Sequence, residues 1–82
     1  MSPITTPTVL PIQRLMAHAT PRAWRDGIVV VVEGAAAAIA FLDGSVGLLH
    51  APAADLVPGE PVAYHPVSEI LAAGGRWTTA RA

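Results

Sequence analysis

Cysteine, lysine and asparagine are absent from this sequence, and only four of its 82 residues are aromatic. Without cysteine the chain can form neither disulfides nor thiolate metal sites. Its length allows one domain, and a domain of this size buries only about 60–65% of the surface that its unfolded chain exposes. The lack of cysteine is compatible with a reducing compartment, so we expect a cytoplasmic protein.

Acidic residues are absent from the first 25 residues, although the whole chain has a net charge of −1. Arg14, Arg22 and Arg25 lie in this segment, whereas residues 26–82 carry two arginines and all six acidic residues. An acidic surface repels a phosphate backbone, which disfavours nucleic-acid binding by residues 26–82. The charge division separates an N-terminal arm, residues 1–25, from a body, residues 26–82.

The apolar runs of the chain are too short for a membrane span. The longest, at residues 28–42, has 15 residues and is interrupted by Glu33 and Gly34, whereas a transmembrane helix needs about 20 apolar residues. The opening MSPITTPTVLPIQ lacks the charged and apolar regions of a secretory signal. We therefore expect no contact with a membrane.

The same stretch carries two opposing propensities. Its β-branched start, IVVVV, favours a strand, whereas the alanines that follow Gly34 favour a helix. Asp43–Gly44 decides between them, because this dipeptide is typical of a two-residue hairpin turn. We therefore predict strands at residues 27–33, 36–42 and 45–50.

Side-chain alternation gives the predicted strand at residues 36–42 two apolar faces. Ala37, Ile39 and Phe41 form the face that suits a core. The opposite face consists of Ala36, Ala38, Ala40 and Leu42. We expect this second face to be covered by the arm or by another chain, or to remain a plain alanine surface.

The rest of the body predicts further short strands. Residues 61–65 follow a loop with a turn at Pro58–Gly59, and Gly74–Gly75 predicts a second hairpin with arms at 69–73 and 76–80. A helix over residues 67–73 stays open as the alternative, because Ser68 can cap it. Five or six short antiparallel strands are typical of a small all-β barrel.

One segment of the body resembles a known family. Residues 38–58, AIAFLDGSVGLLHAPAADLVP, are similar to the hairpin and following "DL" segment of SH3-like barrels of the Tudor type. The matching residues are Phe41, Asp43, Gly44, Asp55, Leu56 and Pro58. The resemblance implies an SH3-like barrel fold. It does not imply recognition of methylated side chains, because the aromatic cage of Tudor domains is not recognisable in the segment.

The arm begins with a proline-containing lead at residues 1–11, which favours a flexible or polyproline-like chain. Pro11 suits the first position of a short helix that Pro21 ends. Ile12, Leu15 and Met16 form an apolar stripe on this helix. Helices shorter than about 12–15 residues are marginal alone. We therefore expect the arm to be partly disordered or to dock on a partner subunit or a second copy.

No catalytic or metal-binding pattern is present. His50 and His65 lie at the ends of predicted strands, but no ligand spacing accompanies them. Ser45, His50 and Asp55 have the residue types of a hydrolytic triad, yet no nucleophile elbow surrounds the serine. We expect no catalytic residues, no cofactor and no metal.

Trp24 lies between Arg22 and Arg25, where it either packs at the junction of arm and body or stacks on nucleic-acid bases. We expect a non-enzymatic binding or adaptor module, regulatory in role, that contacts another protein or associates with itself. The alternative is a nucleic-acid-binding regulator that uses the five arginines. The predicted contact residues are Ile12, Arg14, Leu15, Met16, Arg22, Trp24, Arg25, Ala36, Ala38 and Ala40.

Overall fold

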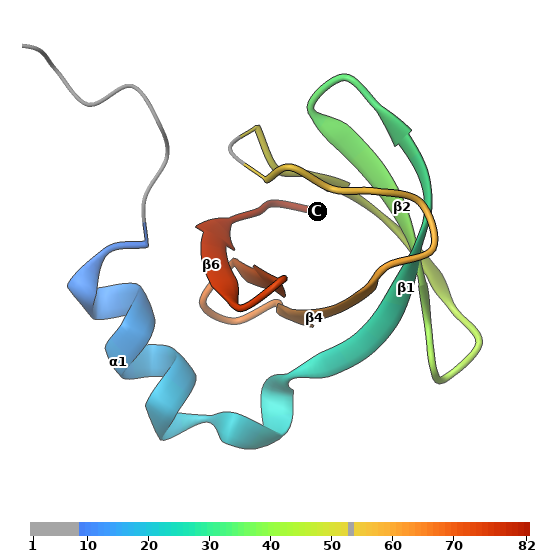
Figure 1. Cartoon of the computed structure of the whole chain (residues 1–82). Helices are drawn as coiled ribbons and strands as arrows, with labels where there is room; N and C mark the ends of the chain where they lie inside the picture. The colour runs from blue at the N-terminus through green and yellow to red at the C-terminus, as the bar shows by residue number, and fades with distance from the viewer. Residues whose placement is uncertain (1–8, 53) are drawn as a thin grey trace, which may run out of the picture.

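The computed structural model describes residues 9–52 and 54–82, which form one six-stranded antiparallel sheet and one short helix (Figure 1). The strand order across the sheet is β3-β2-β1-β4-β5-β6. The strands are β1 (Arg25–Glu33), β2 (Ala36–Phe41), β3 (Val46–His50), β4 (Pro61–His65), β5 (Ile70–Ala73) and β6 (Arg76–Thr79). The prediction of a mostly β domain with one short helix is therefore confirmed.

The arm contains helix α1 (Pro11–Ala19) and a single turn of 3-10 helix, η1 (Pro21–Ala23). Pro11 occupies the first turn as predicted, and the Leu10 N–H donates to the Gln13 side chain at 2.7 Å, which caps the helix start. The predicted flexible lead lies mostly in residues 1–8, outside the described residues.

The alanine-rich segment forms β2, in the interior of the sheet between β1 and β3. Its backbone is paired on both sides, with Ile39 opposite Val29 on one neighbour and Gly47 on the other. This pairing outweighs the helix propensity of alanine. The turn that follows the strand contains Gly44, whose φ of 91° is accessible at low cost only to glycine.

The second hairpin is also formed. β5 and β6 pair across Gly74 and Gly75, which both have positive φ, as the tight connection requires. The alternative helix over residues 67–73 is wrong, because residues 66–69 form turns and strand geometry begins at Ile70.

The inner face of the sheet holds the core. The sheet curls, so that the C-terminal segment returns across from β1 and β2 (Figure 1). Inward-facing side chains alternate along the strands, as the pleat requires. The buried core cluster consists of Val29, Ala37, Ile39, Phe41, Leu49, Ala51, Val62, Tyr64, Leu71 and Ala80.

The two edge strands approach each other at one bridge within the described residues. The His50 N–H donates to the Arg81 carbonyl at 2.6 Å, and the Arg81 N–H donates back at 2.9 Å. Arg81 lies beyond the end of β6, so β6 itself does not form a ladder with β3. The sheet is therefore not closed into a barrel, and the predicted SH3-like closure is not confirmed.

Helix α1 has nine residues, and no helix in the described part of the chain is long and apolar enough to span a membrane.

Candidate functional site

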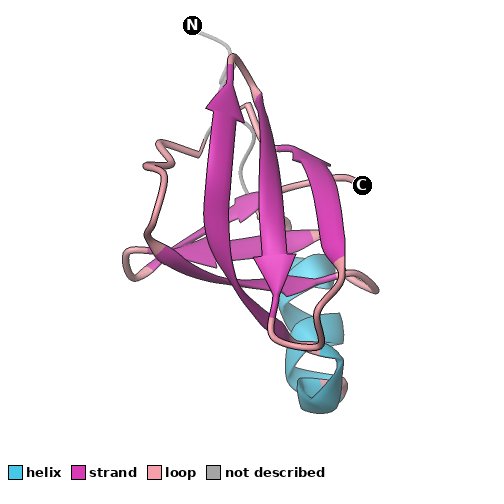
Figure 2. Cartoon of the chain, turned by 90° about the vertical axis from the view of Figure 1, so that its right-hand side faces the viewer, coloured by secondary structure: helices cyan, strands magenta, loops and turns pink. Residues whose placement is uncertain are grey.

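The outer side of β1, β2 and β3 presents an apolar surface. Cross-strand register places Ile28, Ala40 and Val46 in one row and Val31, Ala38 and Leu48 in the next. We call these six residues, together with Val30, the outward face. Val46 and Leu48 expose 69% and 68% of their surface, which is unusual for such side chains in a folded domain. Figure 2 faces the β1–β2 side of the molecule, and the helix does not cover these strands.

A β-bulge enlarges this face. The register between β1 and β2 shifts between Val29 and Val31, so that both Val30 and Val31 are exposed while Val29 is buried. Strict alternation along the run of valines would have placed Val31 in the core. Sequence reasoning therefore found the alanines of this face but missed the larger side chains beside them.

An ion pair borders the face at one end. Arg25 donates to Asp43 at 2.9 Å and to Ser45 at 2.7 Å, and its guanidinium lies 4.0 Å from the centre of the Phe41 ring. Hydrogen bonds from the Ser45 hydroxyl and N–H, with the nearby Arg25, lower the pKa of Asp43 to about 2. Arg25 is thus engaged within the chain.

The arm lies against the outer side of the other half of the sheet. Gln13 donates to the Ser68 carbonyl at 2.9 Å, and Ala17 is buried. His65 is fully buried beneath the arm: its Nδ1 accepts the Ser68 N–H at 3.1 Å, and its Nε2 lies 2.8 Å from the Thr20 carbonyl. Because Nδ1 accepts and a carbonyl can only accept, His65 donates from Nε2 to Thr20.

Aromatic rings cover this arm–body junction. Trp24 meets His65 edge-on at 5.0 Å between ring centres, and it lies 5.2 Å from Trp77. Arg14 lies 5.4 Å above the Trp77 ring, and His18 packs beside it at 5.9 Å. We call Arg14, Arg76 and Trp77 the Trp77 patch; with Gly75 they line a surface hollow of about 410 Å³.

The structure divides the predicted contact residues between two regions. Arg14 and Trp24 belong to the arm–body junction, and Ala36, Ala38 and Ala40 lie on β2. The stripe on α1 is exposed, since the helix turns Gln13 and Ala17 toward the sheet. The exposed stripe consists of Ile12, Leu15 and Met16; Arg22 is exposed on η1. Docking of this stripe on a partner stays a prediction.

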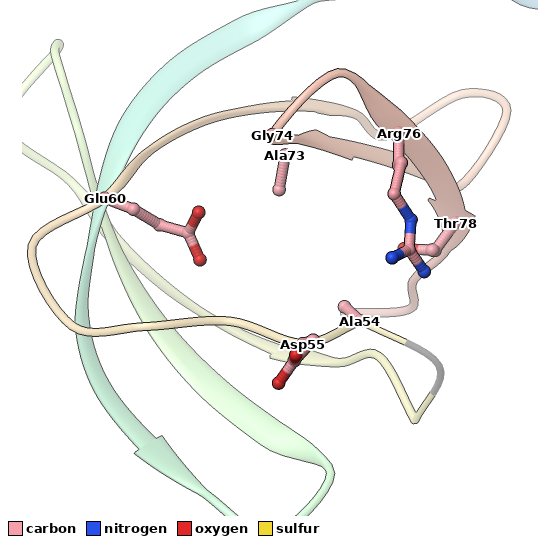
Figure 3. A pocket seen from close by; sticks show the side chains of 7 residues that line it. All are labelled: Ala54, Asp55, Glu60, Ala73, Gly74, Arg76 and Thr78. Carbon is pink, nitrogen blue, oxygen red and sulfur yellow. The ribbon is translucent and has the colours of Figure 1, made fainter.

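A small pocket lies inside the curl of the sheet, lined by Asp55, Glu60, Arg76 and Thr78 among others (Figure 3). Glu60 and Arg76 point toward the enclosed space, but Glu60 accepts the Val57 N–H at 2.6 Å. The cavity measures about 160 Å³, below the roughly 300–1,000 Å³ typical of ligand sites. It offers little room for a substrate.

The histidines do not meet as a metal site. His65 is enclosed by Thr20 and Ser68, whereas His50 is exposed beside Arg81. Within residues 9–52 and 54–82 no group of three or more metal-ligating side chains is found. Ser45 bonds Asp43 and Arg25, with no printed contact to His50 or Asp55.

Comparison with protein-family models, curated proteins and solved structures gives no match to this chain. The resemblance to SH3-like barrels therefore stays a prediction.

Proposed function

We propose that this chain is a non-enzymatic protein-binding module whose contact surface is the outward face. One observation carries the proposal: large apolar side chains stand exposed in adjacent rows on three strands, with alanines between them. Removing such a surface from water is the main driving force of protein association. The rows contain no charged side chain, so a partner would not have to desolvate ions at their centre.

The test compares two valines of similar exposure. Val31 lies on the outward face and is 49% exposed, whereas Val67 lies in a turn after β4 and is 52% exposed. Val31→Glu should abolish co-purification of the partner from the native cell, because it buries an unpaired carboxylate in the contact. Val67→Glu is the control and should retain the partner. Recovery of the same proteins with both variants would refute the proposal.

A second candidate function is binding of single-stranded nucleic acid at the Trp77 patch. Arg14 from the arm and Arg76 from the body flank the Trp77 ring, and neither forms an ion pair within the described residues. Two guanidinium groups beside an indole suit a phosphate and a stacked base. The acidic body makes this function the less favoured one.

Titration with an oligothymidine, followed by tryptophan fluorescence, tests the second candidate. Arg14→Gln should weaken binding and flatten its salt dependence by a slope of about 0.7 per phosphate contact. Arg22→Gln, on the exposed η1, is the control and should change neither. Absence of quenching at low salt would exclude this function.

The curl of the six-stranded sheet and the His50–Arg81 bridge support the proposed relation to SH3-like barrels. The absence of cysteine supports the proposed cytoplasmic location.

A further inference from the structure

The direction of the backbone groups in β3 follows from its pairing with β2. The Phe41 N–H donates to the Ser45 carbonyl at 2.8 Å, so these opposite residues are a hydrogen-bonded pair. In an antiparallel ladder, hydrogen-bonded and non-hydrogen-bonded pairs alternate. The backbone N–H and C=O groups of Val46, Leu48 and His50 therefore point away from β2, toward the open edge of the sheet.

His50 provides an independent check of this direction. Both of its backbone groups bond Arg81, which lies on the far side of β3 from β2. Among the described residues, Val46 and Leu48 have no such backbone partner at the edge. The free part of the edge is therefore the stretch from Val46 to Leu48.

This stretch lacks the features that protect natural sheet edges. It contains no charged residue, no proline and no bulge, and its side chains are apolar and exposed. Natural proteins usually cover or interrupt such edges, because free N–H and C=O groups in a row pair readily with another strand. The opposite edge of the sheet is different, since Gln13 of the arm reaches the Thr79 side chain on β6.

We propose that this edge pairs with the same edge of a second copy of the chain, antiparallel and about a two-fold axis at Gly47. Val46 of one copy then lies opposite Leu48 of the other, and about four hydrogen bonds form between the copies. The free groups of each copy all find partners in this register, and the apolar side chains become cross-strand neighbours. No like charges meet within the paired stretch.

Gly47 fits the position on the axis. There the two chains form a non-hydrogen-bonded pair, in which the Cα atoms approach to about 4.5 Å. The inner side of Gly47 is already occupied by the Phe41 ring, since an added Cβ would lie 2.9 Å from Cε2. A residue without a side chain therefore serves both the core and the crossing of the strands.

The inference goes beyond the proposed function, because it names a second copy and a backbone contact. Pairing two β3 strands joins the two outward faces side by side without covering Val31 or Ala38. The dimer would present its partner with a doubled apolar surface.

Sedimentation velocity of the full chain over a range of concentrations tests the inference. We expect a concentration-dependent dimer whose dissociation constant rises at least about tenfold in Leu48→Pro, which removes the outward N–H and leaves the β2 ladder intact. Leu48→Val is the control, because it keeps the N–H and an apolar side chain. A monomer up to millimolar concentration, or a dissociation constant unchanged by Leu48→Pro, would overturn the inference.

Amide hydrogen exchange on the unmodified chain gives a test that needs no substitution. The Val46 and Leu48 amides should exchange more slowly as concentration rises, whereas Gly47, already bonded to β2, should be protected throughout. Concentration-independent exchange at both residues would contradict the pairing.

The two proposals fail separately. Val31→Glu should leave the dimer intact while the co-purifying partner is lost, because Val31 lies on β1, two strands away from the edge. A monomeric chain that loses its partner in Leu48→Pro would mean that the edge holds a strand of another protein. That outcome would overturn the second-copy inference and leave the proposed function standing.

Discussion

His65 is the residue whose replacement should reveal most clearly how the arm is held. The imidazole is fully buried, accepts the Ser68 N–H and donates to the Thr20 carbonyl. His65→Leu keeps an apolar side chain of similar size but removes both hydrogen bonds. We expect the free energy of unfolding to fall and the arm to loosen from the body.

The magnitude follows from the two groups left behind. Ser68 is only 4% exposed, so its N–H loses its partner away from water at a cost of about 1–3 kcal/mol. Thr20 is exposed, so its carbonyl can bond water at little cost. A loss of about 1–3 kcal/mol is large beside the roughly 4–12 kcal/mol expected for a domain of this length. In a melting experiment it corresponds to a fall of about 4–20 °C.

Urea denaturation followed by circular dichroism and by tryptophan fluorescence measures the effect. Fluorescence reports on the junction because Trp24 contacts His65 directly. His65→Asn is the matched control, since its side-chain oxygen can accept the Ser68 N–H in place of Nδ1. It should recover part of the loss. If His65→Leu is as stable as the natural chain, the buried hydrogen bonds do not anchor the arm.

Three further outcomes follow from local geometry. Gly27→Ala should cost about 1–3 kcal/mol in urea denaturation, because its Cβ would lie 2.7 Å from Ile39 Cγ2; unchanged stability would refute this close packing. Burial raises the pKa of Tyr64, so the neutral phenol stabilises the fold below about pH 10, and this contribution is lost as pH rises through the folded pKa. Ultraviolet absorbance of this single tyrosine should titrate above its usual range, and titration at about pH 10 in the folded chain would contradict the burial. The pKa of Asp43, lowered to about 2 chiefly by Ser45, predicts a stability contribution that is present above about pH 4 and lost as pH falls through 2. Asp43→Asn should remove that acid-range dependence in pH-dependent melting, and an identical pH profile would count against the hydrogen bonds.

The local parts of this fold could be predicted from short stretches of sequence. Asp43–Gly44 and Gly74–Gly75 mark both hairpins, because their turns need backbone conformations that glycine adopts at low cost. Pro11 likewise marks the start of α1. Each of these signals acts within a few residues, so no tertiary contact is needed to interpret it.

The extent of the outward face could not be predicted in this way. The alanines of β2 follow alternation, but the bulge beside Val30 inserts a residue that a run of identical valines does not reveal. The bulge is set by how β1 pairs with β2. Periodicity along one strand contains no information on that register.

What the sequence determined by itself was the set of β-strands, their turns and a short arm helix, since these depend on neighbours in the chain. Tertiary structure alone decided which side of that helix meets the sheet. The apolar stripe of Leu15 and Met16 would be expected to pack inward, yet Gln13 and Ala17 do so. The physical reason is that Gln13 satisfies carbonyls more than fifty residues away, near His65, whose own bonds tie the arm to the body. Such long-range polar matching exists only once the sheet has formed.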